Sequence, residues 1–206
     1  MCLLIHKPKD IELPPQLLDS AVEFNPHGFG FMSFDANGQL VIRRRYQTSR
    51  DELNALYEEF KKSECVIHLR YGTSGVIDAE NTHPIRITDD IYMAHNGTIN
   101  MNRHTDDRSD TWHLVHDYLE PILRNRPELL HDRFFHELVT SWCGPQNKFV
   151  FMDAKSQKTV VINREQGFEI EGLWLSNLRW FDISKFNWIQ PRIPLATHGP
   201  QALFSI

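Results

Sequence analysis

The first apolar run of the chain, Cys2-Leu3-Leu4-Ile5, is the feature that most restricts its fold. It stops at His6-Lys7 before Pro8, so it is long enough for a strand and too short for a helix or a membrane span. Comparable strand-like runs recur at 65–69, 91–94, 148–152 and 159–163. Helical patterns separate several of these runs, so the sequence predicts an α+β fold with buried strands in its middle.

Cys2 directly follows the initiator Met1. Methionine aminopeptidase removes an initiator that precedes a small side chain, so we expect the mature chain to begin at Cys2. That residue would then carry both a thiol and a free α-amine, and each titrates near neutral pH. The thiolate could act as nucleophile and the amine as its base. A cysteine in a first strand is also commonly a small buried hydrophobe, so this residue alone does not decide between the two roles.

Turn and capping residues predict the remaining elements. Ala36-Asn37-Gly38 is a hairpin signal between the strand-like runs 29–34 and 39–46, and Gly28 and Gly30 around Phe29 predict a close approach of two backbones. We expect helices to begin at Pro15, Ser49, Ser109 and Pro127. The apolar side chains predicted to face inward in the first and last of these helices are Leu17, Leu18, Val22 and Phe24, and Leu129, Leu130, Phe134, Leu138 and Val139.

Three polar positions could serve amide hydrolysis by Cys2. Asn96-Gly97 at a strand end offers an amide side chain and an unshielded backbone N–H for an oxyanion, although an ordinary Asn-Gly turn has the same sequence. Arg70 could clamp a carboxylate or form a surface ion pair. Asp110 could hold an ammonium group or simply cap a helix. Together these residues describe a pocket for an α-amino acid with a side-chain amide.

Six motifs carry a resemblance to a known family. They are Cys2, 25–30 (NPHGFG), 68–73 (HLRYGT), 81–84 (NTHP), 95–99 (HNGTI) and 109–111 (SDT). Their order and spacing resemble the glutaminase domain of class II glutamine amidotransferases, which belong to the N-terminal-nucleophile hydrolases. The resemblance implies a four-layer αββα sandwich with Cys2 on a central strand.

The resemblance also implies roles for individual residues. Cys2 would be the nucleophile, with Asn96 and the Gly97 N–H as the oxyanion hole. Arg70 would bind the glutamine α-carboxylate and Asp110 its α-ammonium. The residues implied to line or brace the pocket are Tyr71, Thr73 and His83. The sequence departs from the family pattern at Leu3, His27 and Ser74, where relatives often have glycine, aspartate and histidine.

The function that follows is hydrolysis of the L-glutamine side-chain amide through a Cys2 thioester, releasing glutamate and ammonia. Such domains are usually fused to a synthase that uses the ammonia. The 206 residues leave no room for one, so a separate partner protein is expected to accept it. One alternative is an amidohydrolase of γ-glutamyl peptides or related amides. Another is a non-catalytic binding module that keeps the fold.

Composition limits the remaining possibilities. The net charge of -5 gives no reason to expect binding to nucleic acid or to an anionic membrane. Three scattered cysteines form no disulfide framework, which indicates a reducing compartment such as the cytoplasm. His113 and His116 lie one helical turn apart but lack further ligands, so neither a metal nor a cofactor is expected. We treat residues 1–206 as one domain, with motifs in 2–111, return strands from 148 and an aromatic tail. The tail aromatics are expected to complete the core, and a docking surface is the alternative.

Overall fold

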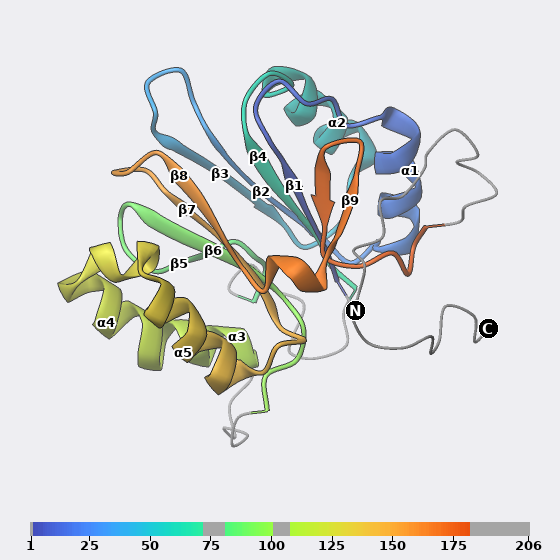
Figure 1. Ribbon diagram of the computed structural model, residues 1–206. Helices are drawn as coiled ribbons and strands as arrows, with labels where there is room; N and C mark the ends of the chain where they lie inside the picture. Colours follow the sequence, from blue (N-terminus) through green and yellow to red (C-terminus); the bar gives the residue numbers. More distant parts are fainter. Residues whose placement is uncertain (1, 72–80, 101–107, 182–206) are drawn as a thin grey trace.

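The computed structural model describes residues 2–71, 81–100 and 108–181. Thr73, Ser74 and the tail aromatics Phe186 and Trp188 therefore lie outside the described residues. Two antiparallel sheets and two groups of helices make up the fold (Figure 1). This mixture of helices and antiparallel sheets agrees with the α+β class predicted from the sequence.

The larger sheet has six strands in the order β3-β2-β4-β1-β10-β9. Their bounds are β1 Leu3–Lys7, β2 Phe29–Phe34, β3 Leu40–Arg45, β4 Cys65–Leu69, β9 Phe168–Ile170 and β10 Leu173–Leu175. β1 lies inside this sheet, with Leu3 opposite Leu69 on β4 and Ile5 opposite Leu175 on β10. The predicted strand therefore exists and is buried throughout, but Cys2 immediately precedes it.

The smaller sheet has four strands in the order β5-β6-β7-β8. Their bounds are β5 Ile85–Arg86, β6 Ile91–Asn96, β7 Lys148–Asp153 and β8 Lys158–Ile162. An apolar cluster that includes Leu4, Val66, Ala94, Val150 and Trp174 draws side chains from both sheets. Burial of these side chains holds the two sheets against each other.

Helices α1 (Pro15–Phe24) and α2 (Arg50–Glu59) pack on the larger sheet, where Leu17 and Leu53 share one buried cluster with Leu3. The predicted helix start at Ser49 is confirmed, because the Ser49 hydroxyl accepts the Glu52 backbone N–H at 3.3 Å. Phe24 contradicts the predicted inward stripe of α1: it is 44% exposed.

A second group of helical segments covers the smaller sheet, on the side of the molecule opposite α1 and α2 (Figure 1). The segments are α3 Asp110–His113, the π-helical η1 Leu114–Leu119, α4 Glu120–Asn125, the 3₁₀ segment η2 Pro127–His131 and α5 Arg133–Cys143. Ser109 caps α3 as predicted, since its hydroxyl accepts the Trp112 N–H at 3.1 Å. No helix in the described part of the chain is long and apolar enough to span a membrane.

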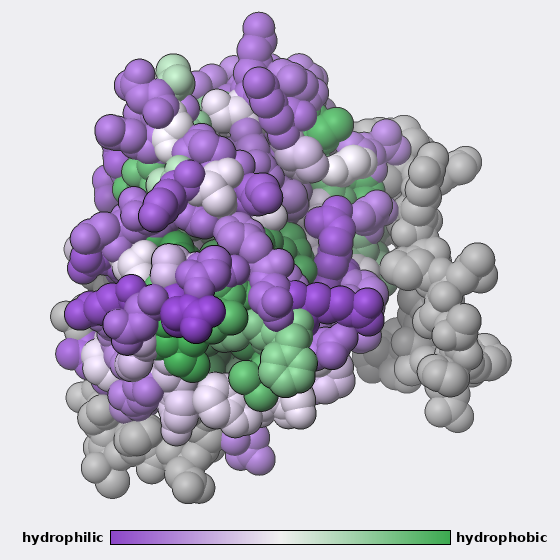
Figure 2. All heavy atoms as spheres, turned by 60° about the vertical axis from the view of Figure 1, so that its left-hand side comes forward, coloured by the Kyte–Doolittle hydropathy of each residue, from purple (hydrophilic) through white to green (hydrophobic). Residues whose placement is uncertain are grey.

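The predicted inward face of the last helix is partly wrong. Leu130 and Val139 are buried, but Phe134 is 73% exposed and Leu138 41%. The expected continuous helix from Pro127 is interrupted at Asp132, whose carboxylate accepts the Phe134 and Phe135 N–H groups and starts α5 afresh. The interruption turns Phe135 inward and Phe134 outward. Figure 2 shows a hydrophobic area on this side of the molecule, at the height of the α4–α5 layer.

The two glycines around Phe29 mark a close backbone approach, as predicted. A Cβ at Gly30 would lie 1.8 Å from the His83 carbonyl oxygen, and one at Gly28 would lie 2.5 Å from the Arg45 carbonyl oxygen. Gly28 also has a φ of +126°, which a residue with a side chain rarely adopts. The absence of a side chain at Gly30 lets β2 pass directly beside His83, which lines the candidate site.

The described aromatic residues of the C-terminal region complete the core as predicted. Trp174 and Trp180 are 1% and 5% exposed, and Phe181 packs against the cluster that includes Trp180. The Trp174 indole N–H donates to the Arg164 carbonyl oxygen at 2.8 Å, which satisfies its polar atom. Trp174 thereby helps to hold β10, which lies between β1 and the edge strand β9.

Candidate active site

Cys2 is held at the start of β1 by side chains from both sheets. Its carbonyl oxygen accepts a hydrogen bond from the Asn96 side-chain amide and another, at 2.8 Å, from the Asn177 amide. Asn96 ends β6 of the smaller sheet, and Asn177 lies two residues after β10 of the larger sheet. The Cys2 thiol donates to the Tyr71 carbonyl oxygen at 3.7 Å. Hydrogen bonds therefore hold both the main chain and the thiol of Cys2 in place.

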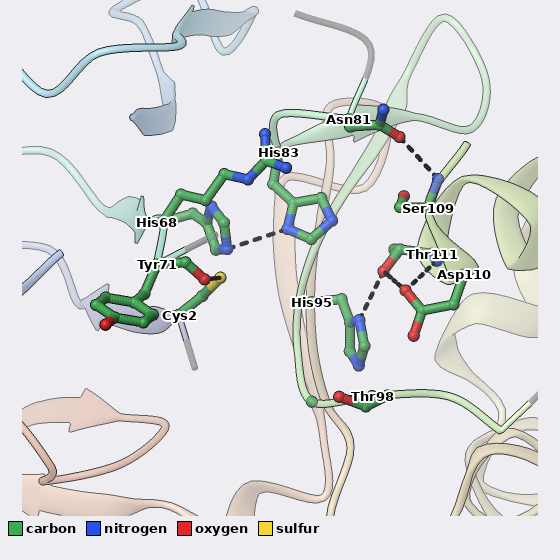
Figure 3. A pocket seen from close by; sticks show the side chains of 12 residues that line it. Cys2, His68, Tyr71, Asn81, His83, His95, Thr98, Ser109, Asp110 and Thr111 are labelled. Carbon is green, nitrogen blue, oxygen red and sulfur yellow. Dashed lines mark hydrogen bonds between the residues drawn. The ribbon is translucent and has the colours of Figure 1, made fainter. Parts of the chain in front are cut away.

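A small polar pocket surrounds this cysteine (Figure 3). Its lining residues are Cys2, His68, Arg70, Tyr71, Asn81, His83, His95, Gly97, Thr98, Ser109, Asp110 and Thr111. The cavity measures about 60 Å³, several times the roughly 10–15 Å³ that one water requires. Of the residues singled out in the sequence, six line the pocket and Asn96 contacts Cys2 directly, while Thr73 lies outside the described residues.

The pocket combines a cation and an anion. Arg70 directly follows β4 and is 4% exposed; its backbone N–H donates to the Gly28 carbonyl oxygen at 2.8 Å. Asp110 is the first residue of α3, and one carboxylate oxygen accepts the Ile99 N–H at 2.6 Å while the other accepts the Thr111 N–H at 2.7 Å. Two oxygens provide about four acceptor positions, so Asp110 retains capacity for a further donor.

A chain of hydrogen bonds links Asp110 to the strand that carries Asn96. The Thr111 hydroxyl lies 2.8 Å from His95 Nδ1 and 3.2 Å from Asp110 Oδ1. His95 Nε2 lies 2.9 Å from Asn147 Oδ1, and the Asn147 amide group donates to the Cys143 carbonyl oxygen. Asn147 Oδ1 is therefore an acceptor, which assigns the proton of the neutral ring to His95 Nε2. Nδ1 then accepts the single hydrogen of the Thr111 hydroxyl, so it is the Thr111 backbone N–H that donates to Asp110 Oδ1. His95 thus connects β6 to α3 as a neutral ring.

Two further buried histidines contact each other in the pocket wall. His83 Nδ1 and His68 Nε2 lie 3.1 Å apart, and both rings are less than 10% exposed. Burial lowers the pKa of His68 to about 3 and lowers that of His83 well below its usual range, and the positive charge of Arg70 adds to both shifts. Burial also lowers the pKa of His95. All three rings are therefore neutral at physiological pH.

These neutral histidines predict a specific loss of stability in acid. The folded protein keeps His68 neutral down to about pH 3, whereas the unfolded chain binds a proton below about pH 6.5. The free energy of unfolding should therefore decrease as the pH falls from 6.5 to 5, by up to ~1.4 kcal/mol per pH unit for each such ring. Urea unfolding at several pH values measures this slope. A His68 imidazole NMR signal that titrates near pH 6.5 in the folded protein would contradict the prediction.

Gly97 occupies a position that only glycine fits. Its φ is +153°, and a Cβ would lie 2.1 Å from Asn147 Oδ1 and 2.9 Å from His95 Nε2. The absence of a side chain lets the chain turn after Asn96 without displacing the bond between His95 and Asn147. Gly97 therefore forms a bend directly after the last residue of β6, and it lies in the wall of the pocket beside Cys2.

The three cysteines have different surroundings. Burial raises the pKa of Cys65 to about 12 and that of Cys143 to about 11, so both remain protonated thiols at neutral pH. Burial also raises the pKa of Cys2, while the Tyr71 backbone and the charge of Arg70 act in the opposite direction. Cys2 is only partly buried and lines the pocket. A base close to its sulfur would be needed to form the thiolate at neutral pH.

Sequence reasoning missed two asparagines of the site. Asn177 and Asn147 lie outside the polar motifs from which the site was predicted, and each reaches it only after the strands pair. Asn177 is near Cys2 because β10 lies beside β1, although 175 residues separate the two in sequence. No group of three or more His, Cys, Asp or Glu side chains within 2–71, 81–100 and 108–181 is arranged to hold a metal ion.

Comparisons with known proteins find similarity in structure. No protein-family model matches the chain, and no curated protein matches it. One similar solved structure is the glutamine phosphoribosylpyrophosphate amidotransferase from B. subtilis complexed with ADP and GMP, with 15% identity and a TM-score of 0.45 over 89% of this chain and 43% of that one. Another is described as the allosteric regulatory enzyme of purine biosynthesis, with 17% identity and a TM-score of 0.48 over the same shares. The chain thus spans less than half the length of these two proteins.

A third similar structure is the glutamine aminotransferase class-II domain protein from silicibacter pomeroyi. It is 12% identical, with a TM-score of 0.44 over 85% of this chain and 87% of that one. The likenesses are distant. All three identities are below 20%, and all three TM-scores are below 0.5.

Proposed function

We propose that this chain is a glutamine amidotransferase domain that hydrolyses the side-chain amide of L-glutamine through a Cys2 thioester. The observation that carries the proposal is that Cys2, the buried Arg70 and Asp110 line the same small pocket. An α-amino acid presents a carboxylate to Arg70 and an ammonium to Asp110. Its side-chain amide then extends toward Cys2.

The proposed reaction has two halves. The Cys2 α-amine, freed by removal of Met1, takes the thiol proton, and the thiolate sulfur attacks the amide carbon. The amine returns the proton to the departing nitrogen as the C–N bond breaks, which releases ammonia and leaves a γ-glutamyl thioester. Water then cleaves the C–S bond, yielding glutamate and restoring the thiol.

Asn96 and Gly97 form the oxyanion hole of this proposal. The Asn96 amide already donates one N–H to the Cys2 carbonyl oxygen, so the amide group reaches the nucleophilic residue. Its second N–H and the backbone N–H of Gly97 are donors suited to the oxygen that becomes charged when sulfur adds. Tyr71 and His83 brace the pocket, and Thr73 is proposed to join them.

The four-layer αββα sandwich of N-terminal-nucleophile hydrolases is part of the same proposal, with residues 1–206 as one domain. It is supported by three apolar clusters: one under α1 and α2, one between the sheets and one under the helices of 110–143. Ammonia would pass to a separate partner protein or a further domain.

Substrate analogues test the assignment of Arg70 and Asp110. Each charge-assisted contact contributes ~1.5–3 kcal/mol, so removal of either charge from glutamine should lower kcat/KM by roughly 10- to 150-fold. The measurement compares glutamine with its α-deamino analogue and its α-methyl ester by following release of ammonia. Equal turnover of a simple aliphatic amide would contradict the proposal and indicate a general amidase.

A further inference from the structure

An exposed aromatic cluster borders the pocket beside the nucleophile. It consists of Phe24 at the end of α1, His27 and Tyr71. The Phe24 and Tyr71 rings are stacked with centroids 6.1 Å apart, and the His27 ring lies 5.3 Å from that of Tyr71 at 47°. Phe24 is 44% exposed and Tyr71 40%. Hydrolysis of glutamine itself assigns no role to this partly exposed apolar surface.

Tyr71 places the aromatic cluster on one side of Cys2. The Tyr71 carbonyl oxygen accepts the Cys2 thiol hydrogen at 3.7 Å, and in Figure 3 the Tyr71 ring points away from His95 and Asp110. In Figure 3 the labelled side chains run from Tyr71 through Cys2 to Asp110, with Tyr71 and Asp110 on opposite sides of the cysteine. A substrate whose α-ammonium lies at Asp110 and whose amide carbon lies at Cys2 therefore points its amide nitrogen toward Tyr71.

We infer that Phe24, His27 and Tyr71 form a leaving-group subsite for a flat aromatic group carried on the amide nitrogen. The inference rests on the proposed function, because the same Cys2, Arg70 and Asp110 bind the glutamyl part. In glutamine that nitrogen carries only hydrogen and does not reach Phe24. An aromatic substituent stacks on the Phe24–Tyr71 surface and removes it from water. The preferred substrates are then γ-glutamyl amides of amines that carry an aromatic ring.

The chemistry of the reaction is unchanged. Sulfur attacks the γ-carbonyl carbon, the C–N bond breaks, and the amine leaves with the proton that the Cys2 α-amine took from the thiol. Water hydrolyses the thioester, so one γ-glutamyl amide and one water give glutamate and the free amine. Only the departing group differs, and it is this group that contacts the aromatic cluster.

A matched set of substrates separates aromatic recognition from chemical reactivity. γ-Glutamyl benzylamide and γ-glutamyl cyclohexylmethylamide both release a primary amine with a six-membered ring on a CH2 group, but only the first ring is flat and aromatic. γ-Glutamyl methylamide provides the small reference. We expect kcat/KM for the benzylamide to exceed that for each of the other two amides by about tenfold. Equal values for the benzylamide and the cyclohexylmethylamide would overturn the inference.

Two variants test whether the preference for the benzylamide arises at the aromatic cluster. Phe24→Ala should lower kcat/KM for the benzylamide about tenfold more than for the methylamide, because only the benzylamide reaches the stacked rings. Phe134→Ala is the control. Phe134 is 73% exposed on α5, and the buried face of α5 packs on the smaller, four-stranded sheet. This variant should leave kcat/KM unchanged for both the benzylamide and the methylamide. An equal loss for both substrates in Phe24→Ala contradicts the subsite.

Glutamine hydrolysis and the aromatic preference can be absent independently of each other. If glutamine is hydrolysed and the aromatic preference is absent, the subsite is wrong and the proposed function stands. If the benzylamide is hydrolysed about tenfold better than the cyclohexylmethylamide and glutamine is not hydrolysed, the subsite stands and glutamine is the wrong substrate. If neither glutamine nor any γ-glutamyl amide is cleaved, the proposed function fails and the subsite with it.

Discussion

Cys2→Ser should reduce glutamine hydrolysis by roughly 10³-fold or more, as losses of a nucleophile do in other hydrolases. A serine hydroxyl is far less acidic than a thiol, so the same base produces much less of the ionised nucleophile. Burial already raises the pKa of the Cys2 thiol, which makes the reaction dependent on a base next to the sulfur. The measurement is steady-state release of glutamate by the purified variant.

Cys65→Ala and Cys143→Ala are the matched controls for that experiment. Both cysteines are buried in apolar clusters, neither lines the pocket, and neither forms thiolate at neutral pH. Each variant should retain activity within about a few fold, with a loss of stability from the vacated volume. Inactivity of a folded Cys65→Ala or Cys143→Ala variant, with Cys2→Ser active, would identify a different nucleophile.

The base assigned to Cys2 can be tested by mass and labelling. If the α-amine of Cys2 acts as base, active protein should have the mass of a chain that lacks Met1. Iodoacetamide should modify Cys2 first, because it is the partly exposed cysteine of the three, and saturating glutamine should slow that modification. Full activity in protein that retains Met1 would exclude the amine as base.

Local signals in the sequence predicted those parts of the fold that local interactions decide. The hairpin at 36–38 and the Ser49 and Ser109 caps need only neighbouring residues, and each is present. The inward face of the last helix could not be predicted from the apolar pattern alone. Asp132 caps a new helix there, and a 3₁₀ turn before it changes which side chains point inward, so Phe134 and Leu138 were misplaced.

The site was predictable to the extent that its residues cluster in sequence. Arg70, Gly97 and Asp110 were identified from motifs, and all three line one pocket with Cys2. Asn177 was not identified, because a single asparagine after a short strand carries no signal of its own. Its contact with Cys2 depends on the pairing of β1 with β10, which is a long-range property of the sheet.

Asn96 and Asn177 offer a comparison that separates positioning of Cys2 from stabilisation of the oxyanion. Both side-chain amides donate to the Cys2 carbonyl oxygen, so loss of either removes one of two hydrogen bonds that hold the residue. Only Asn96 is proposed to donate to the oxygen that becomes charged during the reaction. That bond is stronger in the tetrahedral intermediate than in the ground state, so its loss should appear in kcat.

The expected results differ by orders of magnitude. Asn96→Ala should lower kcat by about 10²–10³ with little change in KM, as loss of one oxyanion-hole donor does in other enzymes. Asn177→Ala should cost much less in kcat, since the oxyanion keeps both donors. Arg70→Ala should mainly raise KM, because the glutamine α-carboxylate keeps its charge throughout the reaction. Both constants should be measured for all three variants, with circular dichroism to establish folding. Equal kcat losses in Asn96→Ala and Asn177→Ala would mean that Asn96 only positions Cys2 and that the oxyanion is bound elsewhere.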